Sequence, residues 1–167
     1  MQYRICKKST IRIVGVKIPL VEEHEVNMLL ILRFWQQTIG TGQIQQISKM
    51  AELEPYGVLG ISAYFDPQHI YYYIAAATNR PVPPGMEEFR IPEATWCMVT
   101  ADPCCHVTSD DMFRYLHLEV LPSSGLFYAE LPDIEVYPIE GRGMETPIQE
   151  AWFAVRPSDE EKPQKVS

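Results

Sequence analysis

The sequence has few positive charges and no long apolar run. It contains 14 Lys and Arg against 22 Asp and Glu, which gives a net charge of −8. Such a chain repels nucleic-acid phosphate, and no Lys/Arg stripe offsets this, so we expect no direct nucleic-acid binding. No window approaches the apolar length of a membrane span, and no signal peptide is visible. We therefore expect a cytoplasmic protein that does not bind membranes.

The sequence also lacks the motifs that carry catalysis and cofactor binding. It has no P-loop, no GxGxxG and no GxSxG. Its four histidines have no partner at motif spacing. We therefore expect a binding protein with no cofactor rather than an enzyme. A small hydrolase is the alternative, because a pocket Glu with nearby Tyr hydroxyls could act as a general base on a water.

The cysteines do not form a secreted disulfide framework. The adjacent Cys104 and Cys105 are awkward to bridge, and Cys6 and Cys97 lie far from them in sequence. With His106, this pair offers thiolate and imidazole groups, which are zinc ligands. A second pair of ligands at metal-site spacing is missing, so we expect these to be loop residues and predict no metal site.

The same order of elements occurs twice along the chain. Hydrophobic periodicity predicts a strand, a helix and two strands, then a Pro/Gly linker at 79–88, then the same series again. The predicted ranges are 3–19, 23–39, 57–65 and 69–78 in the first half, and 86–101, 109–125, 133–139 and 148–155 in the second. This pattern indicates an α+β fold with a duplicated β-α-β-β repeat and pseudo-twofold symmetry. The place where such halves meet is a common ligand site.

The chain is long enough for one hydrophobic core. It has 167 residues, of which 46% are hydrophobic. We expect a single domain over residues 1–157, with pseudo-repeats 1–80 and 86–157. Residues 158–167 carry charges and no apolar run, so we expect a flexible tail there.

Two glutamates, Glu135 and Glu150, lie in predicted strands whose neighbouring residues are apolar and are expected to be buried. Strand periodicity puts Glu135 on the same face as Tyr137, and Glu150 on the same face as Trp152. Either glutamate could simply face solvent or pair with an arginine. The other interpretation is recognition of an organic cation, because aromatic faces attract cations and a buried carboxylate needs a cationic partner or hydrogen bonds.

Six segments in a fixed order resemble the GyrI-like effector-binding family. They are YGVLGI (56–61), IYYYIAAAT (70–78), PPGMEEFRIPEATW (83–96), FRYLHLEVLPSSG (113–125), PDIEVY (132–137) and IQEAWFAV (148–155). The resemblance implies a curved antiparallel sheet with two helices on its outer side. It also implies a central pocket for cationic, amphipathic, drug-like compounds.

The resemblance carries over to particular residues. Glu135 matches the family's pocket acid, and Glu150 matches a second recurrent acid. The candidates for the aromatic walls of the pocket are Tyr72, Trp96, Tyr137 and Trp152. Val120 and Leu126 stand where the family usually has Trp and Tyr, which removes two aromatic positions and changes the expected ligand preference.

The resemblance also bears on partners. The family's domain is attached to many AraC-class and MerR-class transcription regulators, which implies a bacterial protein related to transcription regulation. Those regulators carry a helix-turn-helix domain before it, and no such domain is visible here. We therefore expect a stand-alone sensor or sequestering module for a lipophilic cation. A separate protein partner or a homodimer is possible, and a gyrase-inhibitor-like interaction module is a further alternative.

Overall fold

The computed structural model describes residues 1–139 and 147–157. Within these residues, nine strands form one antiparallel sheet in the order β1-β6-β9-β8-β3-β4-β2-β5, and β7 pairs with β9. The strands are β1 (Gln2–Lys8), β2 (Ile11–Pro19), β3 (Val58–Asp66), β4 (His69–Ala77), β5 (Glu87–Ile91), β6 (Ala94–Thr100), β7 (Leu126–Tyr128), β8 (Asp133–Tyr137) and β9 (Glu150–Pro157). The helices are α1 (His24–Gly40), α2 (Gln43–Met50), α3 (Ser109–Tyr115), a π-helical turn η1 (Leu116–Val120) and α4 (Leu121–Ser124).

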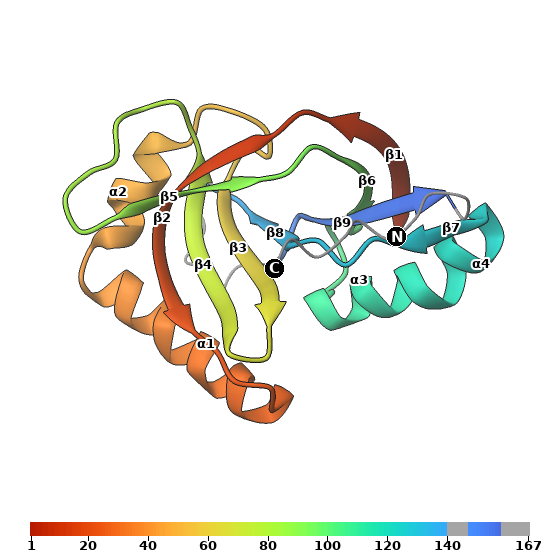
Figure 1. Cartoon of the computed structure of the whole chain (residues 1–167), viewed down its shortest axis with the longest axis horizontal. Coiled ribbons are helices and arrows are strands. Elements are labelled where there is room, and N and C mark those ends of the chain that lie inside the picture. Colours follow the sequence, from red (N-terminus) through yellow and green to blue (C-terminus); the bar gives the residue numbers. More distant parts are fainter. Residues whose placement is uncertain (140–146, 158–167) are drawn as a thin grey trace.

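One long two-stranded ladder joins the two halves of the chain. β1 pairs with β6 and β2 pairs with β5, and the register is the same across the break between them, from Gln2 opposite Thr100 to Gly15 opposite Glu87. The strand order begins with β1 and ends with β5. Because β1 continues into β2, and β5 into β6, both end strands belong to this one ladder. The sheet therefore curves back on itself, as the ring of strands in Figure 1 shows.

The buried side chains form two clusters, one on each face of the sheet. One cluster combines strand residues such as Tyr72 and Phe153 with helix residues such as Trp35 and Leu116. We call this side the helix face. The other cluster, which includes Ile61, Trp96, Ile134 and Trp152, contains strand and loop residues but no helix residue. We call this side the opposite face.

The first helix is anchored through one half only. Phe34, Trp35 and Thr38 are buried in its second half. Met28 and Leu29 in its first half are more than 50% exposed. The first half of α1 accordingly extends past the sheet in Figure 1. Among the described residues, no helix combines the length and apolar character needed to cross a membrane.

The α+β architecture with a duplicated strand-helix-strand-strand order is confirmed. Three details differ from the sequence prediction. The first strand of each half is divided in two, at the point where it changes its neighbouring strand. The short helix α2 and the strand β7 were not predicted. The predicted helix 109–125 contains a π-helical turn. The connection at 140–146 and the predicted flexible tail at 158–167 lie outside the described residues.

Candidate ligand-binding site

Glu135 lies on the helix face, where two tyrosine hydroxyls donate to it. In β8, Ile134 and Val136 point to the opposite face, so the alternation of the strand turns Glu135 and Tyr137 toward the helices. The Tyr137 hydroxyl donates to Glu135 Oε2 at 2.8 Å, and the Tyr72 hydroxyl of β4 donates to Oε1 at 3.0 Å. Both carboxylate oxygens therefore have a neutral donor.

Trp35 of α1 completes an aromatic wall around this carboxylate. Its indole Nε1 donates to the Tyr72 hydroxyl at 3.0 Å. Its ring centroid lies 5.1 Å from that of Tyr137 and 6.5 Å from that of Tyr72, both in edge-to-face arrangements. A chain of hydrogen bonds thus runs from Trp35 through Tyr72 to Glu135, and it fixes where the carboxylate lies.

Gly60 makes room for this arrangement. It stands opposite Glu135 in the ladder between β3 and β8. A Cβ atom at this position would collide with the Tyr72 hydroxyl and would lie 3.1 Å from Glu135 Oε1. The absence of a side chain at residue 60 is therefore a steric condition for the contact between Tyr72 and Glu135.

The first turn of α3 approaches Glu135 from the helix side. Thr108 caps this helix in a capping box with Asp111, which fixes the start of the helix. The side chain of the next residue, Ser109, lies close enough to Glu135 to lower its pKa, and the negative charge of the neighbouring Asp110 acts in the opposite direction. One helix turn therefore brings both a donor and a second acid to the site.

Burial raises the pKa of Glu135 above its usual value, although the hydrogen bonds from Tyr137, Tyr72 and Ser109 act in the opposite direction. Two residues earlier on the same face, burial raises the pKa of Asp133 to about 7, against a hydrogen bond from Tyr128 and with a contribution from Glu135. Within residues 1–139 and 147–157, neither acid forms an ion pair. Among the described residues, the site thus holds buried acid without a cationic partner.

A cavity of about 470 Å³ lies between α1 and the α3–η1 segment. Its lining residues are His24, Asp110, Phe113, Arg114, His117 and Leu118. Helical spacing puts Met28, Ile31 and Trp35 on the same face of α1 as His24, which extends an apolar wall from the cavity toward the aromatic residues. Glu135 is not in the lining, but Asp110 of the cavity and Ser109 beside Glu135 belong to the same turn.

The π-helical turn shapes the cavity wall. It carries His117 and Leu118, and π turns are frequent at functional sites. The His117 ring lies 4.3 Å from Phe113 and 5.5 Å from Tyr128, measured between ring centroids. Its buried Nε2 has no hydrogen-bond partner among the described residues. A polar atom without a partner therefore lies beside this cavity.

Comparison with known proteins shows the family of this chain. Residues 1–156 match the family described as the GyrI-like small molecule binding domain. The chain is a GyrI-like domain. No curated protein compared with it gives a match.

Solved structures share the fold of this GyrI-like domain at low sequence identity. A structure of SAV2435 bound to tetraphenylphosphonium is 17% identical, with a TM-score of 0.76 over 93% of this chain and 94% of that one. A putative bacterial transcription regulation protein from Staphylococcus aureus MU50 is 18% identical, with a TM-score of 0.74 over 93% and 99%. The C-terminal domain of EcmrR is 13% identical, with a TM-score of 0.54 over 93% and 98%.

The GyrI-like domain divides the six predicted ligand-binding residues between two faces. Glu135, Tyr72 and Tyr137 meet on the helix face. The other three meet on the opposite face: Trp96 and Trp152 lie 6.0 Å apart between ring centroids, and Trp152 Nε1 donates to Glu150 Oε1 at 2.8 Å.

The position of Glu150 has a direct consequence for its role. Arg4 Nη2 lies 3.4 Å from Glu150 Oε1, so this acid has a cationic neighbour within the chain. Since Glu135 and Glu150 are on different faces of one sheet, they do not share a ligand charge. The pairing of Glu150 with an arginine was one of the two interpretations open from the sequence.

Three residues of the site were missed from the sequence. In the sequence, Trp35 looks like a core residue of an amphipathic helix. Ser109 looks like part of the start of a helix, and Gly60 is a glycine within a predicted strand. Their common feature is proximity to Glu135 across the sheet or between sheet and helix. A signal existed only for Gly60, because an isolated glycine within a strand often marks a close approach of another group.

The described part of the chain contains no group of three or more His, Cys, Asp and Glu side chains placed to hold a metal. Cys104 and Cys105 are both exposed and carry free thiols. Residues 102–105 form a turn closed by a hydrogen bond from Cys105 N to Asp102 O at 3.0 Å. The segment is thus a surface loop, as expected from the sequence.

Proposed function

We propose that this GyrI-like domain binds lipophilic organic cations through Glu135. The observation that carries the proposal is a buried carboxylate that accepts hydrogen bonds from two tyrosines, lies near Trp35 and forms no ion pair among the described residues. A ligand supplies the missing positive charge.

The physical chemistry of the site favours a cation with spread-out charge. A compact ammonium group is strongly hydrated, and its transfer to a buried site costs more free energy than the interaction with one buried acid returns. A bulky phosphonium or quaternary ammonium ion loses less hydration. It also gains from aromatic faces, by about 0.5–2 kcal/mol for each ring it meets.

The cavity between α1 and α3 gives the ligand its path. The apolar groups of the ligand would contact Phe113, Leu118 and the exposed Met28. The first turn of α3 touches the cavity through Asp110 and Glu135 through Ser109. A ligand in the cavity therefore lies one helix turn away from Glu135.

The role that fits such binding is that of a sensor or sequestering domain. The same fold occurs in a structure of EcmrR with DNA, where this chain covers 57% of the longer protein. By analogy, ligand binding here would change the contacts of a separate partner or lower the free concentration of the ligand.

The deciding experiment compares the parent protein with Glu135→Gln. Tetraphenylphosphonium should bind the parent, and the variant should bind at least about tenfold more weakly, because a buried charge interaction is lost while the shape is kept. The measurement is isothermal titration calorimetry, with tetraphenylborate as a ligand of the same shape and opposite charge.

Glu93→Gln serves as the matched control, because Glu93 is exposed and forms no ion pair among the described residues. It should bind the cation like the parent. Equal binding by the parent and Glu135→Gln, or equal binding of tetraphenylborate, would refute the assignment.

Hydrolysis is the alternative use of the same residues. Glu135 with its raised pKa could act as a general base, and two tyrosines stand beside it. Mass spectrometry of an activated aryl ester incubated with the parent and with Glu135→Gln separates the two readings. Turnover that depends on Glu135 would establish the enzyme, whereas saturable binding of an unchanged ligand supports the binding protein.

A further inference from the structure

The first half of α1 carries a continuous apolar run. Residues 28–32 have the sequence MLLIL. At 3.6 residues per turn, five consecutive side chains point to all sides of a helix, and a helix that is apolar all round needs neighbours all round. Within α1, all of which the structure describes, the buried residues are Phe34, Trp35 and Thr38. The apolar run is therefore larger than the contact that the chain itself supplies.

Leu29 lies on the side of α1 that faces away from the sheet. It is about two and a half turns from the buried Thr38, so the two side chains point to opposite sides of the helix. Val26 and Leu32 stand about 60° to either side of Leu29. Leu29 is 59% exposed, and Val26 and Leu32 are each 38% exposed. We call Val26, Leu29 and Leu32 the outer stripe. A contiguous exposed apolar surface of this kind marks a contact site.

The start of α1 is tied to the segment before it. Asn27 Nδ2 donates to the Val21 carbonyl oxygen at 2.6 Å, and Val21 N donates to Asn27 Oδ1 at 2.9 Å. Asn27 N also donates to the Glu23 carbonyl oxygen at 3.0 Å. These contacts fix the first turn of the helix, so the outer stripe is presented by a formed helix.

One acid and one base lie on the same ridge of the helix as Leu29. Glu25 is one turn before Leu29 and Arg33 is one turn after it. Both charged side chains are exposed. They are about 12 Å apart along the helix axis, which is too far for them to pair with each other. Within the part of the chain that the structure describes, neither forms an ion pair. A second molecule can therefore supply an opposite charge to each of them.

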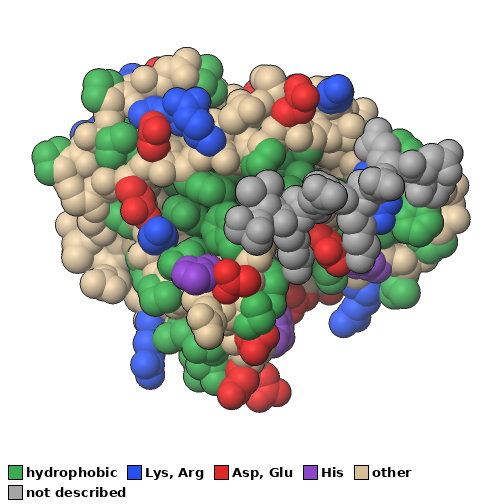
Figure 2. Space-filling view, in the orientation of Figure 1, with side chains coloured by type: hydrophobic (Ala, Val, Ile, Leu, Met, Phe, Trp, Pro, Cys, Tyr) green, Lys and Arg blue, Asp and Glu red, His purple; other side chains and the backbone are tan. Residues whose placement is uncertain are grey.

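The surface of the molecule has the same order of side chains. Along its lower edge, where Figure 1 places α1, Figure 2 shows acidic side chains at the start of the helix, hydrophobic side chains next to them and a positive side chain further along. A surface with opposite charges at its two ends is complementary to itself when it is turned around.

We propose that the outer stripe binds a second copy of this chain, with the α1 helices of the two copies running in opposite directions. Packing the ridge of Glu25, Leu29 and Arg33 beside the same ridge of the other copy places the two Leu29 side chains side by side. It also places Glu25 of each copy beside Arg33 of the other. The contact is the same on both copies, as in a two-fold dimer. The acidic helix starts then lie at opposite ends of the contact and do not repel each other.

The size and charge of this contact predict a weak dimer. A single pair of helices forms a small interface, so we expect a reversible dimer with a dissociation constant in the micromolar range or weaker. The net charge of −8 opposes the approach of two copies, so the two ion pairs decide the direction in which the helices pack. The contact does not depend on cation binding at Glu135.

The first test is analytical ultracentrifugation over a range of protein concentrations. The apparent mass should rise from that of one chain toward that of two. Leu29→Gln should raise the dissociation constant at least about tenfold, because it removes the apolar centre of the contact from both copies. Its thermal melt should match that of the parent, since Leu29 is exposed. Val82→Gln removes an apolar side chain that is 38% exposed outside α1, and it should dimerise like the parent.

The second test reverses the charges. Glu25→Arg and Arg33→Glu each place like charges at both ends of the contact, so each variant alone should dimerise more weakly than the parent. A mixture of the two variants restores opposite charges at both ends and should form a mixed dimer. Glu93→Arg is the control, because it makes the same charge change as Glu25→Arg at an exposed acid outside α1. It should dimerise at least as well as the parent, because it lowers the net negative charge.

Three results would overturn the proposal. A chain that stays monomeric up to the millimolar range in moderate salt would mean that another molecule covers the outer stripe. A dimer that is unchanged in Leu29→Gln would mean a contact elsewhere. Charge variants that associate no better together than alone would exclude the opposite direction of the helices. Leu29→Gln should bind tetraphenylphosphonium like the parent, so this contact and the Glu135 site can fail separately.

Discussion

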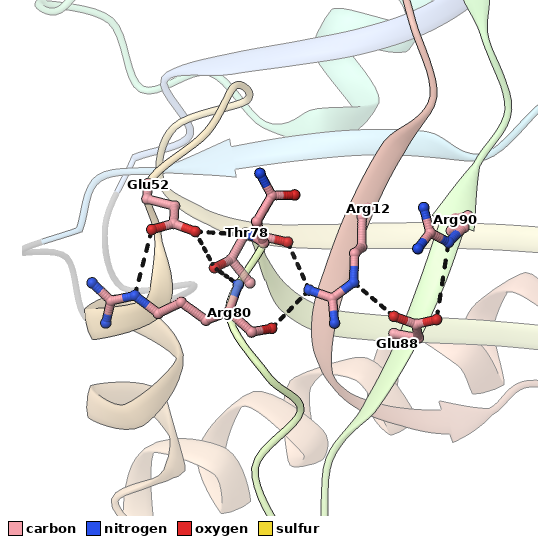
Figure 3. A network of polar contacts seen from close by, with 7 residues as sticks. Arg12, Glu52, Thr78, Arg80, Glu88 and Arg90 are labelled. Carbon is pink, nitrogen blue, oxygen red and sulfur yellow. Dashed lines mark hydrogen bonds and ion pairs between the residues drawn. The ribbon is translucent and has the colours of Figure 1, made fainter.

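Two groups of charged residues in the sheet differ in what surrounds them. On the helix face, tyrosine hydroxyls fix Glu135 and no cation approaches it among the described residues. In the ladder between β2 and β5, backbone carbonyls fix Arg12, and Glu88 lies 2.6 Å from Arg12 Nε (Figure 3). In both places a charged group is positioned by neutral atoms.

Other charged residues of the same sheet are paired within the chain. Lys8 lies 2.7 Å from Glu54, and Lys17 lies 3.1 Å from Glu87. Glu54 holds the pKa of Lys8 above its usual value, although desolvation opposes this. The candidate ligand site therefore differs from a structural ion pair in what surrounds the charge. Among the described residues, neutral donors surround Glu135, whereas an opposite charge lies beside Lys8, Lys17 and Arg12.

The largest expected effect comes from Gly60→Ala. The new methyl group would displace the Tyr72 hydroxyl and break the contacts from Trp35 through Tyr72 to Glu135. We expect the free energy of unfolding to fall by about 1–3 kcal/mol and cation binding to weaken strongly. Urea denaturation and calorimetry measure the two effects.

Gly40→Ala is the control for that experiment, because a Cβ at Gly40 of α1 meets nothing within 4 Å. It should leave stability unchanged or slightly higher. If Gly60→Ala kept full stability and full cation binding, the account of Gly60 as a steric condition for the site would be wrong.

The next effect concerns pH. Because burial raises the native pKa of Asp133 to about 7 from an ordinary 3.8, the native state binds this proton more tightly than the unfolded state. Its stabilising contribution is present at acid pH and is lost as pH rises through 7. We expect this residue to lower the free energy of unfolding by about 1 kcal/mol between about pH 6 and about pH 8.

Asp133→Asn should flatten this part of the stability profile, which thermal melts at several pH values can follow. Cation affinity of the parent should rise over the same pH range, because the Asp133 carboxylate on the helix face becomes charged. An unchanged stability profile in Asp133→Asn would mean that another group titrates.

The smallest effect is expected for Tyr137→Phe. The variant keeps the ring beside Trp35 but loses the hydrogen bond to Glu135, which holds the carboxyl pKa down. The pH midpoint of cation binding should therefore move upward, with affinity at alkaline pH within about threefold of the parent. Tyr64→Phe, at a residue that is 52% exposed, should leave the midpoint unchanged. A downward shift in Tyr137→Phe would contradict the role of its hydroxyl.

The sequence predicted the features that depend on the pattern of residues within one strand or helix. Alternation within one strand correctly put Glu135 with Tyr137, and Glu150 with Trp152. Alternation could not predict whether the two pairs lie on the same face of the sheet. That depends on how β8 and β9 align with each other, and the segment 140–146 separates them in sequence. One residue of difference in that alignment would exchange the two sides of a strand.

The missed elements have similar causes. The helix α2 shows Ile44, Ile47 and Met50 at helical spacing, but it is short and otherwise polar. The break between β1 and β2 follows from a change of neighbouring strand, which is a long-range event. For the same reason, the pairing of Arg12 with Arg90 across β2 and β5 could not be predicted from either strand alone.

The ladder that joins the two halves also bears on how the chain folds. Its register brings Gln2 against Thr100 and Gly15 against Glu87, so its first contacts close very long loops. Contacts of this kind slow folding, because the entropy of loop closure is lost before the sheet is complete. Neither repeat can finish its own sheet, since each lends its first strand to the other. The architecture therefore shows the duplication, but the two repeats are not independent folding units. We expect the two halves to fold together.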